Sequence, residues 1–216
     1  MALEFKTFGK LTNSKLIDWY KLMSKDCDVS FIPKKTSWLM KLFAFFIGLA
    51  RIFNKNICSP KEFIEDYTTT IYGNIYLSYQ IGTGNNVSEI FLVLHELKHT
   101  QQFREHPILM PIKYLCSPSK RAEYEVECFI TYLETCSVLL VGTESEKLIH
   151  YQKYANKCLI ELQMNYGVNG DQLEGMKTQF ENYIAMLISG VPIPLTDPVR
   201  IGIQKLIDLN ILNSSF

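Results

Sequence analysis

The segment His95-Glu96-Leu97-Lys98-His99 holds the residue types in this sequence that are best suited to chemistry. On a helix, residues four positions apart share one face, so His95 and His99 can direct their imidazoles at a single metal ion. Glu96 lies one step round from His95, where it can act on a metal-activated water as a general base without being a ligand. Only four histidines occur in the chain, and two of them fall in this pattern. The spacing predicts a catalytic metal site.

The residues around this motif predict a buried helix that runs to about Glu105. Asn86 and Ser88 are both candidates to cap its N-terminus. Residues 90–94 are apolar on almost every face of a helix, which is typical of a buried helix at the floor of a cleft. Pro107 forbids continuation of the helix through the residue before it.

Two histidines make an incomplete site, because a catalytic zinc ion usually takes three protein ligands and a water. His106 is followed at once by Pro107 and is expected in a loop. Three glutamates, Glu123, Glu125 and Glu127, follow on the next long predicted helix, and one of them is expected to bind the metal. Spacing by itself favours Glu123 as the ligand, with Glu127 four residues later as its partner.

The motif followed by a glutamate-rich helix resembles the gluzincin group of zinc metallopeptidases. Glu125-Val126-Glu127 before the small residue Cys128 is similar to the Glu-x-Glu-Ala segment of small gluzincin domains, in the prenyl-protease-like branch and in toxin- or phage-associated peptidases. Gln102, three residues after His99, is also similar to that subgroup. The resemblance covers roughly residues 67–130 and implies that Glu125 is the third ligand. Where relatives often have an aspartate, this chain has Phe129.

The resemblance implies a zinc-dependent metallopeptidase that binds one Zn²⁺ ion at His95, His99 and Glu125 and cuts a peptide or protein substrate. Glu96 would be the general base. The alternative function is a catalytically silent metal-binding or structural component of a larger, phage-like assembly on the same scaffold. Gluzincins often use a downstream tyrosine or histidine to stabilise the oxyanion, and the candidates for that role are His150, Tyr151 and Tyr154.

The hydrophobic periodicity predicts an α+β fold, mostly helical with a small sheet or hairpin before the active-site helix. The resemblance implies that this domain is zincin-like. The hairpin is expected over 67–79 with Gly73-Asn74 as its turn, either as the edge that pairs with an extended substrate or as an ordinary part of a small sheet. A short strand is expected at 28–33, and a connector at 107–114. Further helices are expected at 14–25, 59–66, 117–141, 143–166, 171–189 and 198–210, with Ser14 and Asp171 as caps.

The predicted organisation is one domain over residues 1–216. Its parts are N-terminal helices with the hairpin (1–83), the active-site and ligand helices (84–142) and a C-terminal helical lobe (143–216).

Residues 38–53 are the most hydrophobic segment of the chain. The uninterrupted apolar part, between Lys41 and Arg51, is only nine residues long, whereas a membrane span needs about 20. A transmembrane helix is therefore not expected. Three alternatives stay open for this segment: a buried helix, a helix on a membrane surface, or a docking helix for a partner protein.

Composition narrows the function classes and the location. Lysine plus arginine equals aspartate plus glutamate, 22 each, so there is no basic excess of the kind that nucleic-acid binding requires. The six cysteines form no Cys-x-x-Cys pair and are expected to be reduced thiols. Residues 1–15 lack the apolar core of a signal peptide. The expected location is cytoplasmic, alone or within a larger particle.

Overall fold

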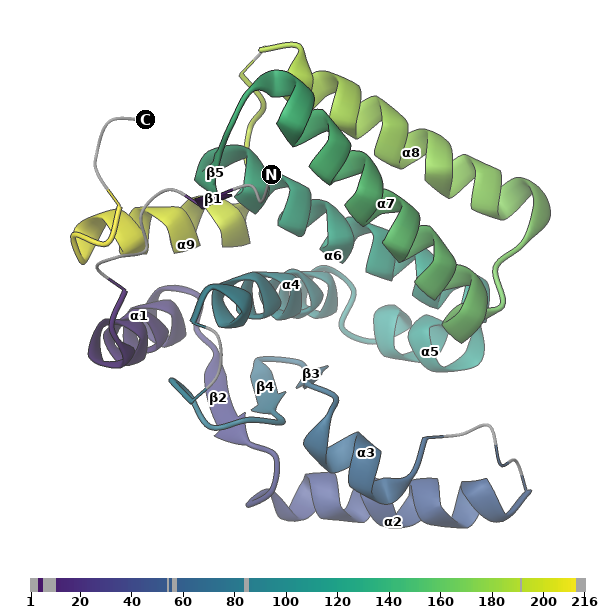
Figure 1. Cartoon of the computed structure of the whole chain (residues 1–216). Coiled ribbons are helices and arrows are strands. Elements are labelled where there is room, and N and C mark those ends of the chain that lie inside the picture. The colour runs from purple at the N-terminus through teal and green to yellow at the C-terminus, as the bar shows by residue number, and fades with distance from the viewer. Residues whose placement is uncertain are drawn as a thin grey trace.

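A computed structural model describes residues 4–5, 11–53, 55, 58–83, 86–190 and 192–212 (Figure 1). It is mostly helical with a small mixed sheet, which agrees with the predicted α+β class. The elements are β1 (Glu4–Phe5), α1 (Asn13–Asp26), β2 (Ser30–Pro33), α2 (Trp38–Phe53), α3 (Pro60–Glu65), β3 (Thr69–Ile71), β4 (Asn74–Leu77), α4 (Asn86–Glu105), α5 (Leu109–Cys116), α6 (Pro118–Leu139), β5 (Leu140–Val141), α7 (Glu144–Tyr166), α8 (Gly170–Ile188) and α9 (Asp197–Asp208).

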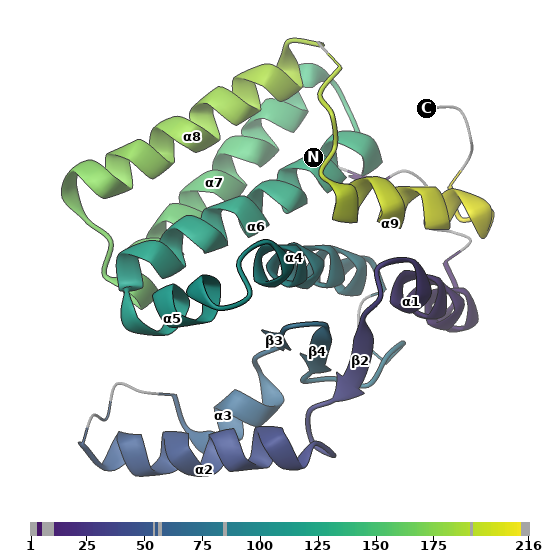
Figure 2. The same ribbon diagram turned by 180° about the vertical axis from the view of Figure 1, so that it is seen from behind.

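Helix α4 is the central element, as its apolar sequence predicts. Ile90, Val93 and Leu94 have no exposed surface. In both ribbon views α4 lies between the layer of α6, α7 and α8 and the small sheet (Figures 1 and 2). Helix α9 approaches α4 at Gly202, where an added Cβ would lie 2.6 Å from a Leu94 methyl group, so only glycine fits without displacement. The Trp19 indole fixes this crossing by donating to the Gly202 carbonyl at 3.0 Å.

The three-stranded sheet has the order β2-β4-β3, with β2 parallel to β4 and β3 antiparallel to it. The hairpin prediction is confirmed, but its turn is shifted by one residue. Ile71 pairs with Asn74, so the loop is Tyr72-Gly73 instead of Gly73-Asn74. Tyr72 adopts a left-handed φ of 51°. Its ring packs on Phe103 and its hydroxyl donates to a backbone carbonyl beyond α4, and these contacts stabilise a conformation that tyrosine seldom takes.

The prediction of a connector at 107–114 is wrong, because residues 109–116 form helix α5. Pro111 lies in its first turn, where a missing N–H removes no helical hydrogen bond. Residues 140–141, expected at the end of a helix, instead pair with β1 as β5, a long-range pairing that local periodicity does not reveal.

The helix caps agree with the sequence in some places and differ in others. Thr143 and Glu146 form the expected capping box at the start of α7. The N-cap of α1 is Thr12 instead of Ser14, and the N-cap of α8 is Asn169 instead of Asp171. Asn86 and Ser88 lie inside α4.

Helix α2 contradicts the buried-helix alternative for residues 38–53. Among the α2 residues whose burial the structure describes, Met40 and Ala44 are buried, Leu39 and Ile47 are half-buried, and seven large apolar side chains are exposed. In both ribbon views α2 lies at one edge of the molecule, against α3 and away from α6, α7 and α8 (Figures 1 and 2). None of the helices in the described ranges has the length and apolarity needed to cross a membrane.

Candidate metal centre

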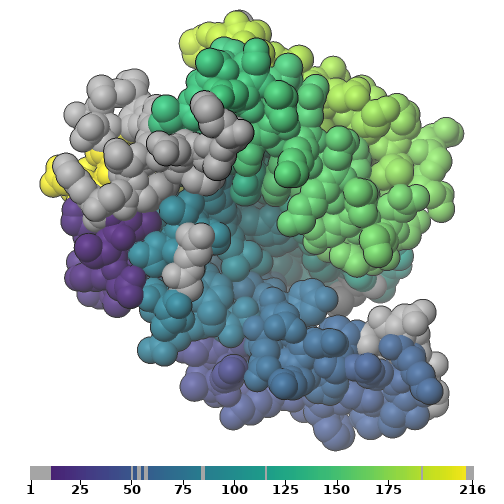
Figure 3. All heavy atoms as spheres, viewed as in Figure 1, coloured from purple at the N-terminus to yellow at the C-terminus, as the bar shows by residue number. Residues whose placement is uncertain are grey.

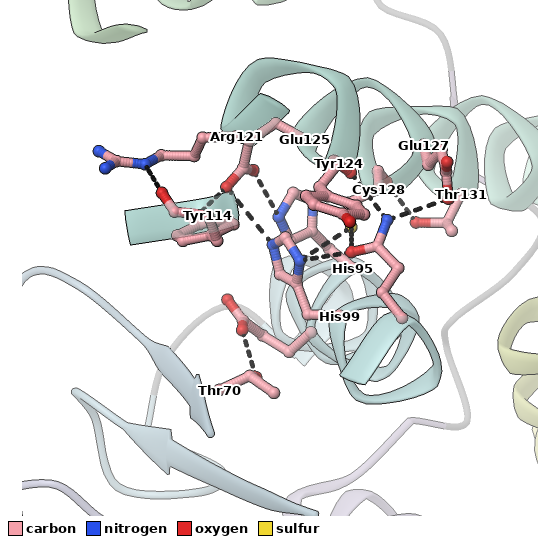
Figure 4. A network of polar contacts seen from close by, with 12 residues as sticks. Thr70, His95, His99, Tyr114, Arg121, Tyr124, Glu125, Glu127, Cys128 and Thr131 are labelled. Carbon is pink, nitrogen blue, oxygen red and sulfur yellow. Dashed lines mark hydrogen bonds and ion pairs between the residues drawn. The ribbon is translucent and has the colours of Figure 1, made fainter. Parts of the chain in front are cut away.

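The two motif histidines face one carboxylate that comes from a different helix. His95 Nε2 lies 3.4 Å from Glu125 Oε2, and His99 Nε2 lies 3.5 Å from Glu125 Oε1. The imidazoles project from α4 and the carboxylate from α6, which packs alongside it (Figure 4). His99 and Glu125 are buried and His95 is nearly so. Three side chains that can each bind a metal ion thus converge in the protein interior.

His99 and Glu125 each favour the charged form of the other, against the effect of their burial. Burial disfavours the charged form of His99, but the adjacent Cys128 and Glu125 raise the pKa of the imidazole well above its usual value. Burial also disfavours the Glu125 carboxylate, yet the two imidazoles hold its pKa well below the usual range. The carboxylate is therefore anionic in this group and requires a cationic neighbour, because an unpaired buried charge is costly.

Gln102 fixes the orientation of His99 from the opposite side. Its Oε1 lies 3.0 Å from His99 Nδ1. Its amide nitrogen donates to the Tyr124 carbonyl and to Glu127 Oε2, each at 3.0 Å, so these two acceptors determine which end of the amide faces the ring. Nδ1 then carries a proton, and Nε2 is the nitrogen that faces Glu125. Because the pKa of His99 is raised, Nε2 is also protonated without a metal and would release that proton when it binds one. The tautomer that remains is the one a metal-binding histidine needs.

Cys128 offers a second donor set. The ligand atoms of His95, His99 and Cys128 lie within 4.8 Å of one another, and such a group can hold a metal ion. The sulfur lies 3.3 Å from His99 Nδ1, the nitrogen that also faces Gln102, whereas Glu125 lies at Nε2. Burial raises the pKa of Cys128 to about 11, so the group is a neutral thiol near pH 7, when the metal ligand would be the thiolate.

Glu96 lies on the same helical turn but is held by the sheet. Its Oε2 accepts a 2.6 Å hydrogen bond from Thr70 Oγ1 on β3, the edge strand. Glu96 is buried, and its Oε1 carries no hydrogen bond to a described residue. The edge strand and the carboxylate are therefore in direct contact, and Thr70 is labelled below the two histidines in Figure 4.

Two tyrosines that the sequence did not suggest reach the same carboxylate. The Tyr114 hydroxyl on α5 donates to Glu125 Oε1, and Tyr166 at the end of α7 also interacts with Glu125. Burial and the carboxylate raise the pKa of both phenols well above 10, so both keep their protons. Arg121 donates to the Tyr114 carbonyl at 2.7 Å and lies over both rings. Tyr114 falls in the segment expected as a connector, which is why no local pattern indicated it.

The other glutamates have different partners. Glu123 pairs with Lys120 on the exposed face of α6. Glu127 accepts from Gln102 and lies 3.5 Å from Lys98. Of the three candidates, Glu125 is the one that faces both imidazoles.

The predicted oxyanion donors have contacts with residues other than the two motif histidines. His150 and Tyr154 stack on Tyr132, and Tyr151 is buried in the main core. Phe129 lies between Tyr154 and His95, in ring contact with each of them. His106 is exposed in the turn after α4, as expected.

Comparisons with protein-family models, with curated proteins and with solved structures find no match to this chain.

Proposed function

We propose that this protein is a zinc-dependent metallopeptidase of the gluzincin type, which hydrolyses peptide bonds in a peptide or protein substrate. One observation carries the proposal: the Glu125 carboxylate on α6 lies within 3.5 Å of the Nε2 atoms of both motif histidines on α4. If the two histidines occurred on a surface helix by chance, a third metal-binding side chain would not be expected to lie buried opposite them.

The donor set suits zinc. Two imidazole nitrogens and one carboxylate are a known ligand combination for catalytic zinc, and three protein ligands leave one position open. His95, His99 and Glu125 would hold the ion, and Gln102 would orient His99. Glu125 is preferred over Cys128 because it faces Nε2 of His99, whereas Cys128 faces Nδ1, the nitrogen that Gln102 already occupies. Zinc bound there supplies a Lewis acid that polarises the scissile carbonyl and lowers the pKa of water.

The remaining residues have separate tasks in this proposal. Glu96 takes a proton from the attacking water and delivers it to the leaving amine, and Thr70 orients the carboxylate for both steps. The protonated phenols of Tyr114 and Tyr166 replace His150, Tyr151 and Tyr154 as the candidate donors to the developing oxyanion, and each would turn its single O–H from Glu125 to do so.

Substrate would enter beside the sheet. The β3 edge lies next to α4, so an extended peptide paired with β3 would pass over Glu96. The space-filling view shows a recess between α7 and the α2–α3 end of the molecule (Figure 3).

The main test combines metal analysis with hydrolysis of a mixed peptide pool. Wild-type protein is expected to carry one zinc ion and to cut peptides, whereas Glu96→Gln keeps the zinc and loses hydrolysis. Stoichiometric zinc without any cleavage would instead favour the silent, structural alternative. Protein that takes up no zinc after metal-replete purification would refute the site itself. The cytoplasmic location and membership of a larger particle stay predictions from the sequence.

A further inference from the structure

Helix α2 has the opposite arrangement of apolar side chains from an ordinary surface helix. Its inner face, which packs on α3, is made of Met40, Ala44 and Gly48 at intervals of four residues. Gly48 permits the close approach, since a Cβ there would lie 3.2 Å from Pro60. Leu39 and Ile47 are half-buried, whereas seven large apolar side chains are exposed: Trp38, Leu42, Phe43, Phe45, Phe46, Leu49 and Ile52.

These outward residues form one continuous surface. Trp38, Leu42, Phe45, Leu49 and Ile52 follow one another at alternating intervals of four and three, so they make a single stripe along the helix. Trp38 is 73% exposed, Phe45 60% and Ile52 72%. Phe43 and Phe46 widen the stripe on one side. Apolar surface that gathers in this way on a protein marks an interaction site.

Basic residues outnumber acidic ones around this apolar face. Between residues 29 and 61 the chain has six lysines and arginines and no aspartate or glutamate, although the whole protein has zero net charge. Lys34 is buried, and the others are at the surface: Lys35, Lys41, Arg51, Lys55 and Lys61. Glu62 and Glu65 on α3 lie within 4.0 Å of Arg51, Lys35 and Lys61. Lys41 and Lys55 make no ion pair with any described residue.

We propose that α2 binds flat on an anionic lipid surface, with its aromatic face in the headgroup region and its lysines against the lipid charges. An interfacial helix combines Trp, Phe and Leu on one face with flanking basic residues. Trp38 at the start of the helix has the side chain most often found at that depth. The 16 residues of α2 are about 24 Å long, too short to cross the hydrocarbon core, so a flat orientation is the one available.

The same charges disfavour a second copy of the chain as the occupant. Intervals of four and three residues are also found in coiled coils, whose flanking positions usually pair acidic with basic residues. Two α2 helices would bring their basic residues together, and the nearby Glu62 and Glu65 already pair with basic residues of their own copy. The face is also broader and more aromatic than a coiled-coil seam.

Membrane binding would set the orientation of the candidate metal centre. Helix α3 packs on α2 and leads within three residues to β3, whose Thr70 contacts Glu96. A lipid surface beneath α2 would thus hold the β3 edge near the bilayer. The lipid binding itself does not depend on the proposed peptidase activity.

Vesicle co-flotation of the full chain tests the proposal. Vesicles of phosphatidylcholine with about 30% phosphatidylserine should carry the protein to the top of the gradient, and phosphatidylcholine alone should carry much less. The emission of Trp38 should shift to shorter wavelength with anionic vesicles, and Trp19, the other tryptophan, is already fully buried. Protein that floats with neither vesicle type would overturn the proposal.

Matched variants separate lipid binding from other causes. Trp38→Glu/Phe45→Glu should weaken binding at least about 100-fold, because two aromatic side chains lose their apolar environment. Ile160→Glu/Met164→Glu makes the same kind of change on the exposed face of α7 and should have no effect. Lys41→Gln/Lys55→Gln should weaken binding to anionic vesicles by about 30-fold at low salt. An unchanged circular dichroism spectrum and an unchanged urea-denaturation midpoint in each variant show that the fold is intact.

Two results would contradict a lipid partner. One is equal flotation of Trp38→Glu/Phe45→Glu and wild type. The other is a wild-type dimer in light scattering that this variant dissociates, combined with no vesicle binding, which would make the α2 face an interface between two copies.

Discussion

Thr70 on the edge strand donates a 2.6 Å hydrogen bond to Glu96 on the motif helix, and this bond joins the sheet to the proposed general base. Thr70→Val removes the hydroxyl and keeps the shape of the side chain. We expect kcat for peptide hydrolysis to fall about tenfold, since hydrogen bonds to charged groups contribute about 1.5–3 kcal/mol. Zinc content should not change, because Thr70 contacts none of the proposed ligands. Loss of zinc from this variant would contradict the assigned role.

The ligand assignment predicts different results for four substitutions on α6. Glu125→Ala should abolish tight zinc binding, while Glu123→Ala and Glu127→Ala should retain it. Cys128→Ala should also retain the metal if the sulfur lies outside the coordination sphere. Equilibrium dialysis measures these affinities, and the cobalt-substituted protein supplies an independent check. A thiolate-to-cobalt charge-transfer band that disappears in Cys128→Ala would show that Cys128 is a ligand.

Gln102 should affect zinc affinity without touching the metal. Gln102→Leu removes the acceptor at His99 Nδ1, and we expect the affinity for zinc to fall about 10- to 100-fold, as is usual for partners of metal-bound histidines. Gln101→Leu is the control, since Gln101 bonds to Glu105 away from the site. A competition assay with a chelating dye would measure both variants. Equal affinities would mean that Gln102 serves packing alone.

Tyr114 is expected to act on the transition state. Its phenol is protonated and lies at Glu125, so Tyr114→Phe should lower kcat about 10- to 100-fold with KM little changed. Phenylalanine keeps the ring contact with Arg121. The corresponding changes in the residues suggested by the sequence, Tyr151→Phe and Tyr154→Phe, should leave kcat within about twofold. A drop in kcat for Tyr154→Phe alone would reverse the assignment.

Lys34 makes stability depend on pH in a defined direction. The side chain is buried, donates to Tyr67 and Thr69, and lies over Phe63. Burial lowers the pKa of Lys34 to about 8, partly opposed by Glu96. Between about pH 8 and pH 10 the unfolded chain holds this proton and the folded protein releases it, so the free energy of unfolding rises with pH.

Urea denaturation of wild type and Lys34→Met at about pH 7 and about pH 9.5 measures this effect. Relative to the variant, the free energy of unfolding of wild type should be about 1–2 kcal/mol higher at about pH 9.5 than at about pH 7. The comparison removes the contribution of tyrosines that ionise in the same range. A wild-type advantage that stays constant or shrinks over this range would contradict a lowered Lys34 pKa.

The sequence by itself determined the motif and most of the helices, although it did not indicate α5. Hydrophobic periodicity and caps such as Thr143 are local, so the positions of α4, α6 and α7 follow from neighbouring residues. The spacing of His95 and His99 put both on one helical face before any tertiary contact was known. Spacing alone favoured Glu123 as third ligand, and the family resemblance favoured Glu125.

Only the tertiary structure decided how the helices face one another. Glu125 rather than Glu123 opposes the imidazoles because the rotation of α6 against α4 sets which glutamate points inwards. Tyr114 and Thr70 reach the site from α5 and β3, and no local pattern encodes which side chains these elements direct at the motif helix and α6. The exposure of the outward face of α2 was likewise decided by tertiary packing. An apolar helix is buried or exposed according to what packs against it, and Met40, Ala44 and Gly48 are the side on which α3 packs.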